Sequence, residues 1–294
     1  MDMKRLEVLK TYKIYIGGKF PRTESGRFYK LLNKAKEPIA NVCLSSRKDV
    51  RNAVQVARKA QGTWQERTAF NKGQVLYRIA EMLEGRRTQF IEELMLEDYT
   101  ETEANVEVNN SIDRIVYYAG WCDKFNQVAS SVNPVSSSHF NFSSYEPTGV
   151  VGIIAQNSSG LLGLVSMLMP VIAGGNSCVI IASEDKPLCA VTLAEVLNSS
   201  DVPGGVVNIL TGSIAELWSP LSSHMDVNGI AMDKLNKYVS EVQLASVDNL
   251  KRVRIYSNDF SLVREQGIQF ITDFQELKTT WHPIEKIGGA SSSY

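Results

Sequence analysis

The side chains that most often act as nucleophiles lie far apart in this sequence. Its four cysteines, Cys43, Cys122, Cys178 and Cys189, have neither CxxC spacing nor the spacing of metal ligands. A free cysteine behaves as a small apolar side chain, so we interpret each of them as a packing residue. This cysteine usage is typical of a reduced, cytoplasmic protein.

The histidines and serine runs do not predict a site either. His139, His224 and His282 share no ligand spacing, so no metal site is expected. The serines at 136–138 and 291–293 lack the setting of a catalytic nucleophile and are interpreted as loop residues.

Composition narrows the class of protein. The chain has 294 residues, is 44% hydrophobic and has a net charge of −1, with no block of like charge, so neither nucleic acid nor an anionic membrane is an expected partner. The first ten residues lack the apolar core of a signal peptide. Residues 150–173 are long and apolar enough to cross a bilayer, but polar residues at 156–159 and Pro170 interrupt them. We interpret this stretch as a strand, a turn and a buried helix.

The first half of the chain is predicted to be mainly helical. Residues 12–20 suggest a hairpin around Gly17-Gly18. Apolar residues recur at helical spacing in later segments, which gives a helical layer before any buried strand. The predicted helices cover 47–60, 69–87, 90–96 and 103–125.

From Gly149 the pattern changes to alternating strands and helices. Nearly continuous apolar strands separated by helices predict a parallel sheet covered on both faces. Residues 132–146 suggest an extended, exposed hairpin, 268–281 suggest extended structure, and the serine-rich end suggests a frayed terminus. The predicted strands are 150–155, 179–181, 206–209, 229–232 and 252–256, and the helices between them are 160–173, 188–197 and 235–245.

Several of these segments resemble the aldehyde dehydrogenase superfamily. EPTGVVGIIAQN (146–157), PVIAGGNSCVII (170–181) and VPGGVVNILTG (202–212) match its cofactor-binding strands and turns. EELMLEDYTETEAN (92–105) matches an acidic helix end, and ITDFQELKTTW (271–281) resembles its C-terminal oligomerisation strand. The resemblance implies a Rossmann-like α/β nucleotide-binding domain at 1–131 and 147–260, with an oligomerisation arm at 132–146 and 268–285.

The resemblance also implies that the catalytic domain is missing. Members of the superfamily are much longer, and the absent block would follow residues 252–256. The chain is most similar to the truncated second copy of two-copy members, or to a free-standing version of it. Aldehyde oxidation needs a cysteine thiolate, an oxyanion donor, a nicotinamide cofactor and a carboxylate base.

The catalytic positions are altered. No cysteine here has the glycine-rich setting of the family's nucleophile. Tyr256 occupies the position of the general-base glutamate, and a phenol does not replace a carboxylate base at neutral pH. Asn157 aligns with the oxyanion donor; it is either a remnant of that donor or a turn-forming residue, and we favour the turn.

The cofactor positions are only partly kept. Asn157, Glu184 and Gly212 are the residues expected to line the former cofactor cleft, and Glu184 is either a ribose ligand or a solvated loop carboxylate. The lysine that would contact ribose is replaced by Ile181. The phosphate-side turn now contains Asp233, whose charge repels an anion. No cofactor is therefore expected, with weak NAD or NADP binding as the alternative.

These observations favour a non-catalytic, aldehyde-dehydrogenase-like protein that acts in assembly or regulation. Its expected partner is a second copy or an active aldehyde dehydrogenase, although the two arm segments could instead pair within one monomer. Two other hypotheses stay open: a residual nucleotide-binding sensor, and an oxidoreductase subunit that obtains its thiol and base from another chain.

Overall fold

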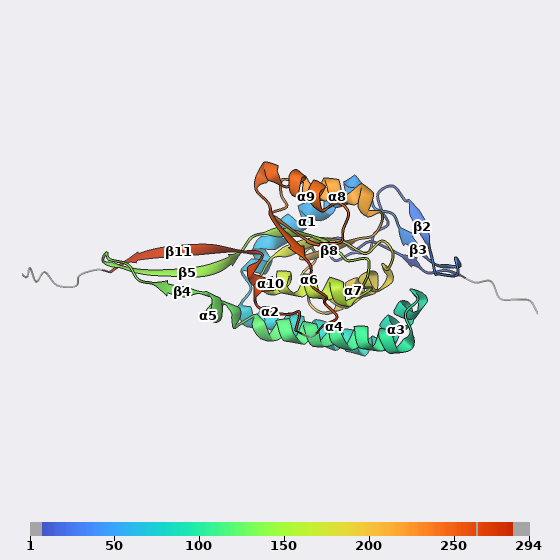
Figure 1. The fold of residues 1–294 in the computed structure, drawn as a ribbon, viewed down its shortest axis with the longest axis horizontal. Helices are drawn as coiled ribbons and strands as arrows, with labels where there is room; N and C mark the ends of the chain where they lie inside the picture. Colours follow the sequence, from blue (N-terminus) through green and yellow to red (C-terminus); the bar gives the residue numbers. More distant parts are fainter. Residues whose placement is uncertain (1–7, 263, 285–294) are drawn as a thin grey trace, which may run out of the picture.

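A five-stranded parallel sheet forms the centre of the fold (Figure 1). The computed structural model describes residues 8–262 and 264–284. The strands of this sheet are β6 (Val150–Ile154), β7 (Ser177–Ile181), β8 (Val207–Leu210), β9 (Gly229–Asp233) and β10 (Arg252–Tyr256). They lie in the order β10-β9-β6-β7-β8, and every neighbouring pair is parallel. The order reverses between β6 and β9, which is the topological switch point of a doubly wound fold.

Both faces of β6, β7, β8 and β9 are buried, which explains their largely apolar sequences, whereas the edge strand β10 is partly exposed and contains Arg252 and Arg254. Val150 and Ile154 of β6 belong to the same buried cluster as residues of α1 and α8, whereas Val151 and Ile153 belong to the cluster on the other face. This division follows from the strand geometry, because successive side chains point to opposite faces. The predicted Rossmann-like α/β fold is therefore confirmed.

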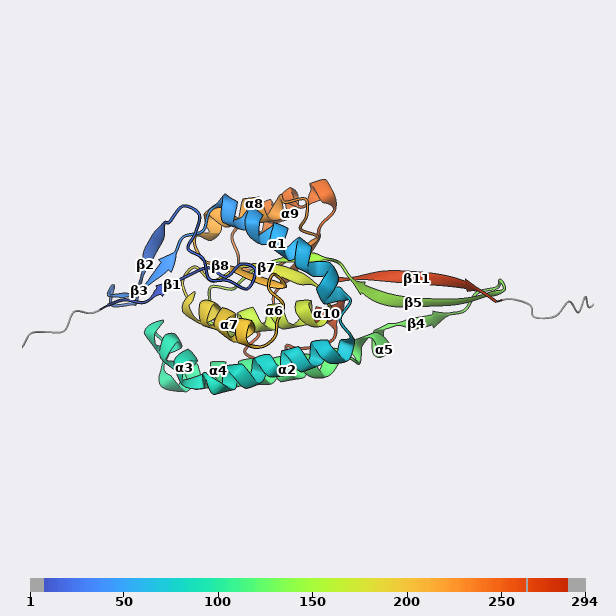
Figure 2. The ribbon, with the colours of Figure 1, turned by 180° about the vertical axis from the view of Figure 1, so that it is seen from behind.

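Helices cover the sheet in layers (Figures 1 and 2). One face is covered by α1 (Arg47–Gln65), α8 (Ile214–Ser222) and α9 (Val239–Ala245). The other is covered by α6 (Leu162–Ala173), which is buried along its whole length, and by α7 (Leu188–Ser199). A further layer beyond α6 and α7 contains α2 (Ala69–Gly85), α3 (Arg87–Leu96) and α4 (Glu101–Trp121).

The helix starts are set by local sequence. Ser46 and Asp49 form a capping box at the start of α1, and Thr100 and Glu103 form another at the start of α4. The predicted helix 103–125 is too long, because α4 ends at Trp121 and a separate short helix, α5 (Phe125–Ala129), follows.

A small sheet lies at the end of the molecule opposite the arm (Figure 1). It contains β1 (Thr11–Tyr12), β2 (Phe28–Leu32) and β3 (Pro38–Cys43), of which β2 and β3 are antiparallel. Neither β2 nor β3 was predicted. Val42 of β3 is buried, so a buried strand does precede the helical layer, contrary to the prediction. The predicted hairpin 12–20 is reduced to a single bridge between Ile16 and Lys19 around the Gly17-Gly18 turn.

The arm is a three-stranded antiparallel sheet that projects from the body (Figures 1 and 2). It contains β4 (Ser131–Asn133), β5 (His139–Pro147) and β11 (Gln275–Pro283), in the order β11-β5-β4. The whole of β11 pairs with β5, from Gln275 opposite Pro147 to Pro283 opposite His139. The predicted hairpin at 132–146 is confirmed, and the two arm segments pair within one chain.

Three further predictions need correction. The segment 268–281 is not extended throughout, because α10 (Gln269–Thr272) precedes β11 and buries Phe270 and Ile271. The helix predicted at 235–245 begins only at Val239. Helix α8 was not predicted, because serines and Pro220 obscure the apolar periodicity of Ile214–Ser222. The predicted frayed terminus lies outside the described residues.

Candidate functional site at the carboxyl edge of the sheet

The switch point between β6 and β9 faces a cavity of about 490 Å³. In doubly wound folds, ligands bind in this crevice outside the carboxyl ends of the strands. Gln156 follows β6, and Asp233 is the last residue of β9. The Gln156 Nε2 amide donates a hydrogen bond to Asp233 Oδ2. These two side chains therefore connect the two halves of the sheet across its switch point.

Asn157 lies beside this cavity and organises a loop. Its Oδ1 accepts hydrogen bonds from Ser183 Oγ at 3.2 Å and from the Glu184 backbone N–H at 3.1 Å. The side-chain carbonyl thus joins the β6–α6 loop to the β7–α7 loop. This bonding is what the turn-forming interpretation of Asn157 expects, and a role as oxyanion donor stays untested.

Glu184 lies against Asn157, so the structure brings these two predicted cleft residues together. They line a cavity of about 320 Å³ with the start of α8, and Gly212 precedes that start but is not among the lining residues. Glu184 Oε2 accepts a hydrogen bond from the Ile214 N–H, at the first residue of α8, at 3.0 Å. Gly212 has a φ of 135°, and a Cβ there would lie 2.9 Å from the Ser45 backbone nitrogen. Glycine is therefore required at 212 by the backbone itself.

The turn after β9 is organised by Asp233. Its Oδ1 accepts a hydrogen bond from the Leu235 N–H, and Asn236 Oδ1 accepts one from the Tyr238 N–H at 3.0 Å. These turn bonds compete with helix formation and delay the start of α9 to Val239. An anion that approached this turn would meet the carboxylate of Asp233.

Glu107 on α4 is a residue of this edge that the sequence did not indicate. Its Oε1 accepts hydrogen bonds from Ser159 Oγ at 2.6 Å and from the backbone N–H groups of Leu161 and Leu162 at 3.1 and 2.9 Å. The Gly163 N–H donates to Ser159 Oγ at 2.7 Å. The N–H donors of Leu161, Leu162 and Gly163 at the start of α6 are therefore bound within the chain.

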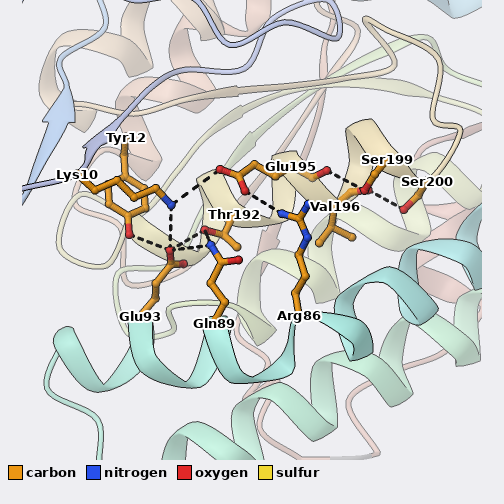
Figure 3. A network of polar contacts seen from close by, with 10 residues as sticks. All are labelled: Lys10, Tyr12, Arg86, Gln89, Glu93, Thr192, Glu195, Val196, Ser199 and Ser200. Atoms are coloured by element: carbon orange, nitrogen blue, oxygen red, sulfur yellow. Dashed lines mark hydrogen bonds and ion pairs between the residues drawn. The ribbon is translucent and has the colours of Figure 1, made fainter.

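Two buried acids on α3 hold the neighbouring helix α7. Glu93 Oε1 accepts hydrogen bonds from Tyr12 OH and Thr192 Oγ1, both at 2.8 Å (Figure 3). Glu97 Oε1 accepts one from the Leu188 N–H, at the first residue of α7, at 2.8 Å. Burial raises the pKa of both carboxyl groups, that of Glu97 to about 8.

The predicted general-base position lies in an aromatic cluster. Tyr256 is 7% exposed, and its ring packs against Phe260 and Phe270. Its hydroxyl donates a hydrogen bond to Asp273 Oδ2 at 3.0 Å. Burial, reinforced by the charge of Asp273, raises the pKa of the Tyr256 phenol. A phenol kept protonated in this way donates a hydrogen bond and does not accept a proton.

The loop at 257–267, which separates β10 from α10, is anchored to the core by Arg114. This buried arginine of α4 donates to Ser166 Oγ at 2.7 Å. It also donates to the carbonyl oxygens of Glu265, Phe260 and Leu262 at 2.9, 3.1 and 3.2 Å. Phe260 is 3% exposed. The loop is thus held both by a guanidinium that binds three of its carbonyls and by an inserted aromatic ring.

The remaining candidate side chains do not gather at this edge. All four cysteines are buried, and burial raises the pKa of the Cys122 thiol to about 12 and also raises those of Cys178 and Cys189. Among the described residues, no three histidine, cysteine or acidic side chains are placed to hold a metal ion. His139 and His282 lie on neighbouring strands of the arm, far in sequence from His224. No helix in the described part of the chain is long and apolar enough to cross a membrane.

The strand order and the placement of the edge residues define a doubly wound α/β domain of the nucleotide-binding type, with an added β arm. The chain belongs to the aldehyde dehydrogenase family, whose family model matches residues 21–255. The match ends within β10. This agrees with the prediction that the resemblance to the nucleotide-binding domain ends at residues 252–256.

Individual relatives show the same partial coverage. An aldehyde dehydrogenase of Aspergillus niger is 31% identical over 247 residues, which are 82% of this chain and 49% of the relative. Omega-crystallin of Enteroctopus dofleini is 30% identical over 253 residues, which are 83% of this chain and 50% of the relative. An aldehyde dehydrogenase from Bacillus cereus, solved as a complex with NAD+, is 26% identical, with a TM-score of 0.79 over 83% of this chain and 50% of that one. The chain spans about half the length of these relatives.

Proposed function

We propose that this protein is a non-catalytic member of the aldehyde dehydrogenase family that acts in assembly or regulation. Its arm associates with a second copy of the chain or with an active aldehyde dehydrogenase. The observation that carries the proposal is the arm, a sheet of three strands that extends away from the body (Figures 1 and 2).

The arm presents apolar side chains on both of its faces. Val132 and Phe140 lie on one face and are 67% and 47% exposed, while Leu277 and Trp281 lie on the other and are 58% and 56% exposed. A three-stranded sheet gains its stability from packing of an apolar face. Its outer strands β4 and β11 also present main-chain groups that can pair with another strand. These features support association through the arm.

The chemistry of the body supports a non-catalytic role. Tyr256 aligns with the general-base position and donates a hydrogen bond to Asp273. The four cysteines are buried, and a thiol is a nucleophile only as an accessible thiolate. Free thiols also suit a reducing compartment, so we place the protein in the cytoplasm.

The oligomeric state of the purified chain tests this proposal. Native mass spectrometry at micromolar concentration is expected to show a dimer or larger species, alone or with an active aldehyde dehydrogenase added. The double variant Leu277→Glu/Trp281→Glu is expected to weaken that association at least tenfold, because it places charges on the apolar face of β11.

Val106→Glu is the matched control, since Val106 is exposed on α4, which belongs to the body and not to the arm. It is expected to leave the oligomeric state unchanged. A wild-type chain that stays monomeric and also fails to retain an active aldehyde dehydrogenase would contradict the proposal.

A further inference from the structure

Each helix start or turn at the carboxyl edge of the central sheet is bound by an acidic side chain of the same chain. Glu107 binds the start of α6, Glu97 the start of α7 and Glu184 the start of α8. Asp233 binds the turn that leads to α9. These four contacts cover the junctions that follow β6, β7, β8 and β9.

Such junctions are where a doubly wound fold receives phosphate groups. The first N–H groups of a helix are unpaired within the helix, and the helix dipole makes its N-terminus favourable to an anion. In this chain the Leu161 and Leu162 N–H groups donate to Glu107 at the start of α6, while one N–H group donates to a carboxyl oxygen at the start of α7 and one at the start of α8. The hydrogen bond between Gln156 and Asp233 lies across the switch point itself, where the pyrophosphate of a dinucleotide would have to pass.

We propose that the carboxyl edge of this sheet excludes dinucleotide phosphates, because acidic side chains of the chain itself occupy the N–H donors that would bind them. Two of these acids, Glu97 on α3 and Glu107 on α4, also fasten their helices to α7 and α6. In nucleotide-binding members of the fold, this edge binds the ligand. In this chain it is a region where loops and helices of the same chain are held together by hydrogen bonds, which we call the internal joint.

Lys234 and Lys237 line the two cavities at this edge, and Lys186 lies beside them. Lys186 Nζ donates to Tyr99 OH at 3.1 Å and to the Ser158 carbonyl at 3.0 Å, so it is engaged in the same joint. Tyr99 OH in turn accepts a hydrogen bond from the Gly160 N–H at 3.0 Å. A phosphate would have to displace these bonds and approach the carboxylates of Glu107 and Asp233, which repel it.

The inference concerns a different surface from the arm, so its test is separate from that of assembly. Calorimetric titration of the wild-type chain with NAD+, NADP+ and inorganic pyrophosphate, each to millimolar concentration, is expected to give no saturable heat. The inference would be overturned if any of the three bound saturably and if Asp233→Asn or Glu184→Ala weakened that binding. These acids would then contact the ligand instead of excluding it.

Thermal unfolding tests the structural half of the inference. Glu107→Ala leaves three donors at the start of α6 unpaired and is expected to lower Tm by roughly 5 °C, and Glu184→Ala by roughly 2 °C. Asp185→Ala is the control, since Asp185 is an exposed neighbour of Glu184, and its Tm is expected to match the wild type.

If Glu107→Ala does not fold, Glu107→Gln keeps one acceptor oxygen and is expected to show a smaller loss of Tm. Unchanged melting of both Glu107 variants and of Glu184→Ala would show that these contacts do not hold the joint, and would overturn the inference.

Discussion

The carboxyl edge of the sheet and the arm use their polar and apolar groups in opposite ways. At the edge, carboxyl groups from α3 and α4 bind backbone donors of α6 and α7, so these groups are used within the molecule. On the arm, Leu277 and Trp281 are more than half exposed. At the edge, where the fold would bind a ligand, backbone donors are bonded to side chains of the same chain. On the arm, apolar side chains remain exposed.

This difference indicates what the fold still does. A binding edge costs stability when its donors wait for a ligand, because unpaired buried donors are unfavourable. If no ligand is bound at this edge, as we propose, bonds within the chain can pair the same donors without disturbing the sheet. An association surface cannot be satisfied in that way without losing its role.

The largest expected effect tests whether the loop at 257–267 is part of the folded body. Arg114→Ala removes four hydrogen bonds and leaves the carbonyl groups of Phe260, Leu262 and Glu265 without this donor. The free energy of unfolding is expected to fall by about 3 kcal/mol or more, measured by urea denaturation. Arg114→Lys should recover only part of this loss, because an ammonium lacks the planar fork of a guanidinium. A loss below about 1 kcal/mol for Arg114→Ala would show that the loop is not anchored.

The second prediction concerns the pH dependence of stability that Glu97 of α3 contributes. Folding raises the pKa of Glu97 from its usual 4.5 to about 8, chiefly by burial. The folded state therefore favours the protonated acid. Its contribution to stability is full below pH 4.5 and is lost progressively as the pH rises to about 8. Glu97→Gln removes this titration, so its stability relative to the wild type should increase by about 1 kcal/mol or more between pH 6 and pH 9.

Glu92→Gln provides the control for that measurement, since Glu92 is an exposed acid of the same helix. Its stability relative to the wild type should not depend on pH over the same interval. Parallel pH profiles for the wild type and Glu97→Gln would contradict the assignment of a neutral Glu97.

The smallest expected effect separates a structural from a catalytic role of Tyr256. Tyr256→Phe removes the hydrogen bond to Asp273, which keeps its ion pair with Arg254 at 3.1 Å. The expected loss is about 1 kcal/mol in the free energy of unfolding. The isolated chain should show no oxidation of aldehydes with NAD+ either before or after the change. Turnover by the wild type that Tyr256→Phe abolishes would show that the phenol takes part in chemistry.

The central sheet was predictable from the sequence because its strands are buried on both faces. Cys178–Ile181 and Val150–Ile154 contain no polar or charged side chain apart from the cysteine thiol, and this signal needs no knowledge of their neighbours. In contrast, β2 contains exposed and polar residues, and Ile214–Ser222 contains an internal proline. Their apolar pattern is weak because only part of each element faces the core.

The candidate site was only partly predictable for a different reason. Asn157 and Glu184 were identified by resemblance and do lie together. Glu107 and Arg114 act on partners 55 and 146 residues away, so no local pattern in α4 marks their roles. The late start of α9 depends on turn bonds of Asp233 and Asn236, which compete with the helical pattern of the following residues.

The pairing of β11 with β5 also has a consequence for the order of events during synthesis. Ser143 and Thr279 contact each other across 136 residues of sequence. Every strand of the central sheet lies between β5 and β11 in the chain. The body can therefore fold as it emerges from the ribosome, whereas the arm is completed only after the body has been made. An incomplete chain would lack β11 and with it Leu277 and Trp281. Under the proposed function, only chains whose central sheet has been fully synthesised could then associate through the arm.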